Sequence, residues 1–248
     1  MLKNERQHAV MRILAAEGYI TIDRLCKQLS VSESSVRRDL IDLERQGLVI
    51  RSYGGVELAR NLTRTTNFSM RLHQRINEKR IIAEKAAKLV REKDIVFLDQ
   101  SSSALFLAQE LVKTKKITIV TNNIEILSAP LPPGITIYSS GGRVSSYRRC
   151  LIGADSGDTF ARVRADFVFF SSRALSPDGV IYDTTMEEVM IKEQMIENAE
   201  KKVFLCDSEK FDHYAAFRQC ELSDVDYLIS DVDCRDKYQK YSENLQIL

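Results

Sequence analysis

Residues 31–58 place the strongest constraint on how this chain can fold. Apolar side chains at Val36, Leu40 and Leu43 recur at helical spacing, and Gly47 ends the pattern. Two short β-type runs follow. The Tyr-Gly-Gly turn between them contains glycines that can supply the positive φ of a hairpin tip. A helix, a stop and a two-stranded hairpin in this order predict a winged helix-turn-helix.

Two earlier helices complete this motif. The first is expected over residues 3–17. The second is expected to begin after Thr21, whose hydroxyl can cap it, and its apolar residues recur at i, i+3, i+4 and i+7. Ser32 is the expected N-cap of the third helix. Val31 and Val36 are spaced as a hydrophobic staple, which would fix the angle at which the chain enters that helix.

The third helix carries the side chains expected to reach DNA. Ser34, Arg38 and Arg45 lie opposite its apolar stripe, and Ser35 and Arg37 lie on the flanks. Arginine can bind guanine edges bidentately, and serine can reach a base or a phosphate. Taken alone, this pattern also fits an ordinary amphipathic helix with a charged outer face, but the neighbouring elements favour DNA. With the hairpin included, the predicted DNA-binding residues are Ser34, Ser35, Arg37, Arg38, Arg45, Arg51 and Tyr53.

Length and composition narrow the class of protein. At 248 residues, with 29% charged and 44% apolar side chains, the chain is long enough for two globular domains. A formal net charge of +1 does not by itself indicate a nucleic-acid partner. The five cysteines are dispersed without CxxC spacing, which argues against a disulfide framework and a structural zinc site. Because no signal peptide or membrane-spanning run is visible, we expect no membrane partner and a cytoplasmic location.

Beyond residue 75 the pattern changes to alternating helices and strands. A helix capped by Asn77 is expected to run to Val90. Apolar strands are then expected at residues 95–98, 117–120, 135–138, 167–170 and 203–205. Each of them ends in small polar or charged residues, and open α/β sheets bind ligands at the carboxyl ends of their strands. The repetition therefore predicts an open α/β sheet with a ligand site along one edge.

The loop at residues 99–103 is the first of these strand ends. It opens a helix expected over residues 104–112, so its hydroxyls and backbone N–H groups could hold a phosphate. Lys210, after the last of the five strands, could add a positive charge. Each turn taken alone is ordinary loop chemistry, because Ser, Asn, Asp and Gly fill turns in any fold. Taken together, the turns predict a small anionic ligand.

A family pattern is visible in the first sixty residues. Its members are Arg6, Ile13, Leu14, Gly18, Leu25, Val31, Ser32, Val36, Arg37, Arg38, Asp39, Leu40, Leu43, Gly47, Arg51, Gly54 and Gly55. This pattern resembles the N-terminal domain of the DeoR family of bacterial transcription regulators. The family usually has threonine before its V/I-R-R-D-L segment, and Ser35 keeps a hydroxyl at that position.

The pattern continues through the second half of the chain. Its members there are Asp99, Ser101, Ser102, Ser103, Thr121, Asn122, Asn123, Gly141, Gly142, Gly153, residues 166–170, Gly179, Glu187, Asp207, Ser208, Lys210 and Phe211. They resemble the family's effector domain, which implies a fold similar to ribose-5-phosphate isomerase and CoA-transferases and a phosphorylated sugar as effector. The family usually has Asp-x-Gly-Thr-Thr in the first loop, whereas this chain has Ser101 at the glycine position. A Cβ there could restrict the approach of a phosphate to the backbone.

Pattern and resemblance together give the predicted organisation. We expect an α/β protein with a winged helix-turn-helix domain at residues 1–58, a linker at 59–75 and a larger open-sheet effector domain at 76–248. The predicted effector-binding residues are Asp99, Ser101, Ser102, Ser103, Thr121, Asn122, Asn123, Gly141, Gly142, Arg173, Glu187 and Lys210. No catalytic residue, metal site or cofactor is assigned.

The predicted function is a DNA-binding transcription regulator, most simply a repressor of a sugar operon, controlled by a phosphorylated sugar. Its expected partners are double-stranded operator DNA and further copies of the chain, as a dimer or tetramer. The alternative is a sugar-phosphate isomerase-like enzyme with an added DNA-binding domain. Isomerisation needs a carboxylate base. Enzymes of the similar fold carry an acidic cluster where this chain reads Ser171-Ser172-Arg173, which favours the regulator.

Overall fold

The computed structural model describes residues 3–17, 19–45, 49–52, 54–58, 68–114, 116–130 and 132–248. The chain forms two compact units, Met1–Gln74 and Arg75–Leu248, each with its own internal contacts. Within the described ranges, no helix is long and apolar enough to cross a membrane.

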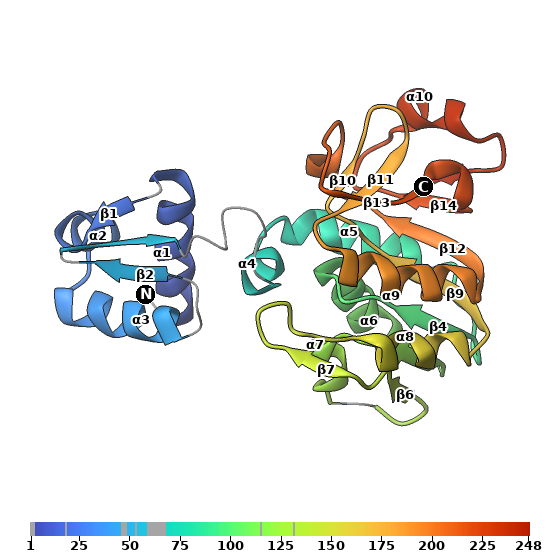
Figure 1. Ribbon diagram of the computed structural model, residues 1–248, viewed down its shortest axis with the longest axis horizontal. Helices are drawn as coiled ribbons and strands as arrows, with labels where there is room; N and C mark the ends of the chain where they lie inside the picture. The colour runs from blue at the N-terminus through green and yellow to red at the C-terminus, as the bar shows by residue number, and fades with distance from the viewer. Residues whose placement is uncertain are drawn as a thin grey trace. The chain divides into compact units, whose positions relative to one another are not determined.

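The N-terminal unit is the predicted winged helix-turn-helix. Its elements are α1 (Lys3–Glu17), β1 (Tyr19–Thr21), α2 (Ile22–Leu29), α3 (Glu33–Arg45), β2 (Val49–Ser52), β3 (Gly55–Leu58) and α4 (Phe68–His73) (Figure 1). The wing has three antiparallel strands in the order β1-β3-β2, so β1 adds a strand that the sequence pattern did not predict. Helix α4 occupies part of the segment expected to be a linker. Gly18, Gly47 and Tyr53 lie outside the described residues.

Local capping explains where the helices of this unit begin and end. The hydroxyl of Thr21 accepts a hydrogen bond from the backbone N–H of Arg24 at 3.4 Å, as predicted for the cap of α2. Ser30 ends α2 in the left-handed conformation with φ of 54°. The carbonyl of Ser32 accepts the N–H groups of Ser35 and Val36 at 3.0 and 3.1 Å, which starts α3. The tight turn between α2 and α3 therefore follows from these local bonds.

The C-terminal unit contains one large parallel sheet. Its seven strands, in spatial order, are β15 (Gln246–Ile247), β14 (Tyr227–Ile229), β12 (Ala199–Leu205), β9 (Ala165–Phe170), β4 (Ile95–Leu98), β5 (Thr118–Thr121) and β6 (Thr136–Ser139). The longer helices are α5 (Ile76–Ala87), α6 (Ser102–Thr114), α8 (Ala154–Ala161) and α9 (Met186–Glu197). All five predicted strands are present, which confirms the predicted open α/β sheet.

The C-terminal unit also contains smaller elements outside this sheet. A hairpin is formed by β7 (Arg143–Ser145) and β8 (Cys150–Ile152), and a second, antiparallel sheet by β10 (Ala174–Leu175), β11 (Val180–Asp183) and β13 (Phe217–Glu221). The short helices are α7 (Ile124–Leu127), α10 (Arg235–Tyr238) and the 3₁₀ turns Ser208–Lys210, Leu222–Asp224 and Gln239–Tyr241. The sequence pattern did not predict either small sheet.

The strand order reverses between β4 and β9. From β4 the chain proceeds through α6 to β5 and β6, and from β9 it proceeds through α9 to β12 on the other side. Right-handed crossovers in opposite directions place α6 and α9 on opposite faces of the sheet. Helix α5 packs against α6, and α8 packs against α9 (Figure 1). The loops that leave β4 and β9 therefore diverge, which is where open α/β sheets form their ligand crevices.

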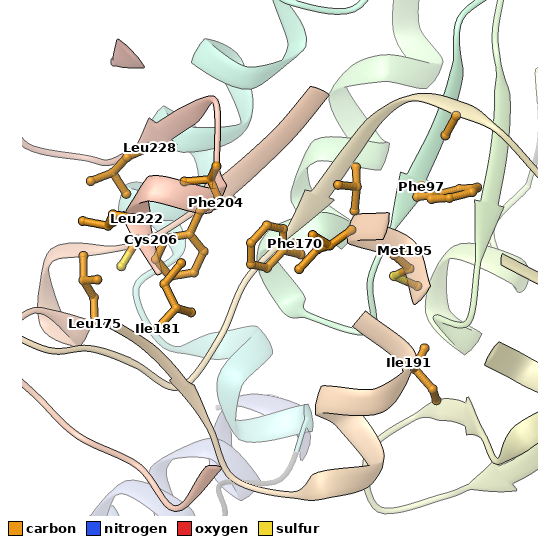
Figure 2. Packing of buried hydrophobic residues seen from close by; sticks show 14 of the residues in the cluster. Phe97, Phe170, Leu175, Ile181, Ile191, Met195, Phe204, Cys206, Leu222 and Leu228 are labelled. Carbon is orange, nitrogen blue, oxygen red and sulfur yellow. The ribbon is translucent and has the colours of Figure 1, made fainter. Parts of the chain in front are cut away.

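The core beneath these loops is buried and contains several aromatic rings. Phe97, Phe170 and Phe204 come from three adjacent strands, and Ile191 and Met195 reach them from α9 (Figure 2). The rings of Phe170 and Phe204 lie 5.3 Å apart between centroids. Close packing of this kind fixes the ends of the strands relative to one another.

The start of α5 differs from the prediction. The helix begins at Ile76, and the N-cap position is occupied by Arg75 with φ of 54°, so Asn77 lies inside the first turn rather than capping it. Its side chain therefore does not start the helix. The tertiary contacts of Arg75, described below, account for a conformation that residues with a Cβ seldom adopt.

Candidate functional site

The predicted DNA-binding side chains of α3 are presented to solvent. Ser34, Arg37, Arg38 and Arg45 are exposed, and Ser35 is half-buried. Glu33 pairs with Arg37 at 2.6 Å, one helical turn away, and the Nε of Arg38 donates to the carbonyl of Ser34 at 3.2 Å. These exposed contacts are weak enough to be exchanged for DNA phosphates or base edges. Tyr53 lies outside the described residues.

A buried ion pair fixes α3 on α1. Asp39 is only 1% exposed and accepts hydrogen bonds from both the Nε and the Nη2 of Arg6, the second at 3.1 Å. Bidentate Arg–carboxylate pairs impose a defined geometry on the two elements that carry them. The exposed face of α3 is thus oriented by a residue on its buried side.

The wing is also tied to α3. Arg51 on β2 pairs with Glu44 on α3 at 2.7 Å, and its backbone N–H donates to the same carboxylate at 3.2 Å. An open hollow between α1 and α3 is lined by Lys3, Arg6, Arg38, Asp39, Ile41, Asp42 and Arg45. Four of these seven side chains are basic, and two of the four, Lys3 and Arg6, pair with Asp42 and Asp39 of the same hollow.

In the C-terminal unit, Asp99 occupies the point where the strand order reverses. It follows β4 directly and is fully buried. One carboxylate oxygen accepts the N–H of Ser101 and the other the N–H of Ser171, each at 3.0 Å. Because Ser171 follows β9, this carboxylate joins the two strand ends. We call Asp99, Ser101, Thr121, Asn122, Asn123, Ser171, Asp183, Glu188, Lys192, Asp207 and Lys210 the strand-end cluster.

The loop after β5 completes one side of this cluster. Thr121 donates its hydroxyl to the carbonyl of Leu98 at 2.6 Å, which joins β5 to β4. The amide of Asn123 donates to the carbonyls of Asp99 and Ser101 at 3.3 and 3.1 Å. Predicted residues from two separate stretches of sequence, 99–101 and 121–123, are therefore brought together.

Ser101, at the position where the resemblance leads one to expect glycine, acts as a helix cap. Its Oγ accepts the N–H of Ala104 at 3.0 Å, and its carbonyl accepts the N–H of Leu105 at 3.3 Å. Its own N–H is taken by Asp99. Two of the N–H groups in this loop are therefore already bonded within the protein, and a phosphate would have to compete for them.

Lys192 is the centre of the cluster. It is 2% exposed, and its ammonium donates to the carbonyl of Ser171 at 2.6 Å, contacts the carboxylate of Asp183 and lies 3.6 Å from Asp99. Burial would lower the pKa of Lys192, but Asp183, Asp99 and then Glu188 outweigh it, so the pKa is raised. Lys192 is therefore a buried cation at neutral pH that neutralises a group of carboxylates.

Glu188, also on α9, accepts the hydroxyls of Thr184 and Thr185 at 3.0 and 3.1 Å. The guanidinium of Arg148, in the turn between β7 and β8, lies 3.8 Å from it. Asp183, Glu188 and Lys192 are absent from the effector-binding residues predicted from the sequence. One signal could have found the lysine: it shares the inward face of α9 with Val189 and Ile196.

Lys210 closes the other side of the cluster. Its ammonium donates to the hydroxyl of Ser171 at 2.6 Å and lies 3.2 Å from the carboxylate of Asp207. Burial alone would raise the pKa of Asp207, but Lys210, with help from Lys79 and Arg75, lowers it overall. Lys210 thus lies at the carboxyl ends of the strands, beside Ser171 and Asp207, as predicted.

The remaining predicted effector-binding residues differ in how deeply they are buried. Ser102 and Ser103 are buried in the first turn of α6. Gly141 and Gly142 follow β6, and a Cβ on Gly142, with φ of 101°, would lie 2.7 Å from the carbonyl oxygen of Ile152. Arg173 is exposed.

Glu187 lies apart from the buried side chains. It is about half exposed and pairs with Arg143 and Arg148 at 3.2 and 2.9 Å. The residue that enters the strand-end cluster is its neighbour, Glu188.

Two buried polar atoms of this region have no hydrogen-bond partner among the described residues. They are the Oγ of Ser103 and the Oδ1 of Asn122. Buried polar atoms are normally satisfied, so such exceptions often mark places where a ligand or water binds. Hydroxyls, amides and carboxylates suit the hydroxyl groups of a sugar, and Lys210 and Arg148 at the margin suit an anion.

Comparison with known proteins gives matches to both units. Residues 6–61 match the DeoR-like helix-turn-helix domain model, and residues 74–232 match the model of the DeoR C terminal sensor domain. The chain is 30% identical to the HTH-type transcriptional regulator GolR of Listeria innocua, over 93% of this chain and 91% of that protein. It is also 30% identical to the HTH-type transcriptional repressor GlcR of Bacillus subtilis, over 93% and 89% of the two chains.

A third relative is the lactose phosphotransferase system repressor of Streptococcus mutans, which is 30% identical over the full length of both chains. Among solved structures, ribose 5-phosphate isomerase A of Methanocaldococcus jannaschii aligns with a TM-score of 0.39 and 16% identity. That alignment covers 54% of this chain and about half (53%) of the isomerase.

Proposed function

Because the chain belongs to the DeoR family of transcription regulators, we propose that it represses a sugar-utilisation operon in response to a phosphorylated sugar. The observation that carries this proposal is the buried strand-end cluster at the reversal of the parallel sheet. A related protein over its full length is a lactose phosphotransferase system repressor, which supports a sugar-linked role. We expect at least a dimer on paired half-sites and action in the cytoplasm, where operator DNA is available.

We place the operator contacts on α3. Arg38→Ala is expected to weaken operator binding by about 1–3 kcal/mol, because an arginine contact to a guanine edge has roughly that value. The measurement is fluorescence anisotropy with full-length protein and a duplex selected in vitro from a random library. Arg162→Ala, an exposed arginine in the C-terminal unit, is the matched control. Unchanged affinity of the Arg38→Ala variant would remove Arg38 from the recognition surface.

We place the effector at the strand-end cluster, with its phosphate near Lys210. A sugar phosphate at a hundred times its Kd should stabilise the protein by about 2.7 kcal/mol, or roughly 5–10 °C in Tm. The screen compares glucose 6-phosphate, fructose 6-phosphate, ribose 5-phosphate and glycerol 3-phosphate with inorganic phosphate and the unphosphorylated sugars. Lys210→Ala should abolish the shift, whereas Lys113→Ala, an exposed lysine on α6, should retain it. A shift retained by Lys210→Ala would move the phosphate elsewhere.

An isomerase-like enzyme is not proposed, because the family consists of regulators and the carboxylates of the cluster are committed to other groups. Asp99 accepts two backbone N–H groups, Asp183 is paired with Lys192, and Glu188 accepts two hydroxyls. A general base must be able to take a proton from substrate, and carboxylates held in this way are poorly suited to it.

A further inference from the structure

Arg75 is the first residue of the C-terminal unit and the N-cap of α5. Its carbonyl accepts the N–H of Lys79 at 3.0 Å, so the helix starts on it. Its φ of 54° is in the left-handed region, which a residue with a Cβ occupies only when surrounding contacts hold it there. Arg75 is therefore the residue at which the chain passes from the N-terminal unit into the C-terminal unit.

The guanidinium of Arg75 contacts the turn that carries Lys210, the carboxylate of Asp231 and, at 3.4 Å, the carboxylate of Glu78 on α5 itself. Its Nη2 donates to the hydroxyl of Ser208 at 2.9 Å and lies 3.6 Å from the carboxylate of Asp231. Asp231 in turn accepts the N–H and the hydroxyl of Ser208 at 2.7 and 2.9 Å. Arg75 and Asp231 therefore both bind the first residue of the Ser208–Lys210 turn.

The other end of the same turn is held by the strand-end cluster. Lys210 bonds to the hydroxyl of Ser171 and pairs with Asp207. The backbone N–H of Lys210 donates to the carbonyl of Asp207 at 3.0 Å, which closes the turn. Only one residue, Glu209, separates Ser208, which Arg75 binds, from Lys210.

The charges of this region are balanced only while Lys210 remains paired. Asp207 is 4% exposed, and its charge is offset mainly by Lys210, with Lys79 and Arg75 contributing less. An anionic ligand that draws Lys210 away would leave Asp207 dependent on the cations of α5. The arrangement of the turn and that of the helix start are thus coupled through electrostatics as well as through Ser208.

We propose that Arg75 is the positioning residue that couples an anionic ligand at Lys210 to the chain entering the N-terminal unit. The inference rests on the proposed sensor function. Ligand binding shifts the Ser208–Lys210 turn, and this shift changes the contacts between the turn and Arg75. As a result, the backbone that leads to the DNA-binding unit changes its preferred conformation. Arg75 itself contributes little to ligand affinity, because its guanidinium binds Ser208 and not the cluster.

The test measures coupling separately from binding. Full-length wild type and the variants Arg75→Gln, Ser208→Ala and Arg80→Gln are assayed for operator affinity with and without the sugar phosphate that gives the largest thermal shift. Ligand affinity is measured by calorimetry on the same samples. Arg80 is exposed on α5 and serves as the matched control.

A coupled wild type should show a change in operator affinity of about 5–150-fold on adding ligand. We expect Arg75→Gln and Ser208→Ala to reduce this ratio at least about fivefold while ligand Kd changes less than about threefold, and Arg80→Gln to behave as wild type. If both variants keep the full ratio, or lose it only together with ligand binding, the role of Arg75 is wrong. If wild type binds operator but no sugar phosphate changes its affinity, the sensor function itself fails.

Discussion

Lys192→Met is expected to lower the free energy of unfolding of the C-terminal unit by about 3–5 kcal/mol, the range for breaking a buried ion pair on one side. Lys192 is 2% exposed and its ammonium faces Asp183, Asp99 and the carbonyl of Ser171. Methionine has a similar length but no donor and no charge. The variant would therefore leave buried carboxylates without their counter-ion.

The measurement is native-state hydrogen exchange of the β4 and β9 amides in the full-length protein, which reports the opening of this unit. Lys113→Met is the control. Its lysine is exposed and pairs with Glu110 across one helical turn, so its loss should cost at most about 1 kcal/mol. If the two variants were equally stable, the assignment of Lys192 as the counter-ion of the cluster would be wrong.

The effect of pH gives an independent check. Because the folded pKa of Lys192 is raised, its stabilisation is complete below the pKa of an unfolded lysine, about 10.4, and is lost as pH rises through the folded value. In the methionine variant, protonation of a carboxylate removes the unpaired buried charge. The deficit relative to wild type should therefore shrink as pH falls from 7 towards 4 and persist from 7 to 9.

The predictions that succeeded rest on signals that are local in sequence. Thr21 caps α2 because its hydroxyl reaches an N–H three residues away, and that geometry is the same in any fold. Five of the seven strands of the large sheet were visible as short apolar runs with polar ends, since both faces of a parallel sheet are covered, whereas β14 and β15 were not predicted. Such features predicted the winged helix-turn-helix, the open sheet and most strand-end residues.

The part that was missed depends on partners distant in sequence. Lys192 looks like one more charged residue on a helix until the fold places Asp99 and Asp183 around it. Glu187 and Glu188 differ by a single helical step of 100°, and sequence did not fix the phase of α9 closely enough to show which one faces inward. The fold shows that Glu188 is the buried member.

Ser101 illustrates a third kind of outcome. The sequence identified it as a departure from the family pattern, but its consequence depends on where its hydroxyl points. The hydroxyl caps α6 through Ala104 while the backbone N–H remains bound to Asp99. Because backbone N–H groups at the start of α6 are already bonded within the protein, the cations near the other strand ends become the stronger candidates for binding the phosphate.

Arg6→Met is the second change expected to have a large effect. It leaves Asp39, 1% exposed, as an unpaired carboxylate between α1 and α3, which should cost the N-terminal unit about 3 kcal/mol or more. Hydrogen exchange of the α3 amides in the full-length protein measures the loss. Lys3→Met removes an exposed partner of Asp42 on the same two helices and should cost at most about 1 kcal/mol.

A double variant separates stability from orientation. Replacing both members of a buried pair with apolar residues of similar volume is often neutral, so Arg6→Met with Asp39→Leu should regain most of the lost exchange protection in α3. Operator affinity provides the second readout. Recovery of both properties would mean that the single variant is harmful only because it leaves the Asp39 carboxylate buried without a partner. Recovery of protection without operator affinity would mean that the two hydrogen bonds between Arg6 and Asp39 set the angle at which α3 meets DNA, which the bidentate geometry leads us to expect.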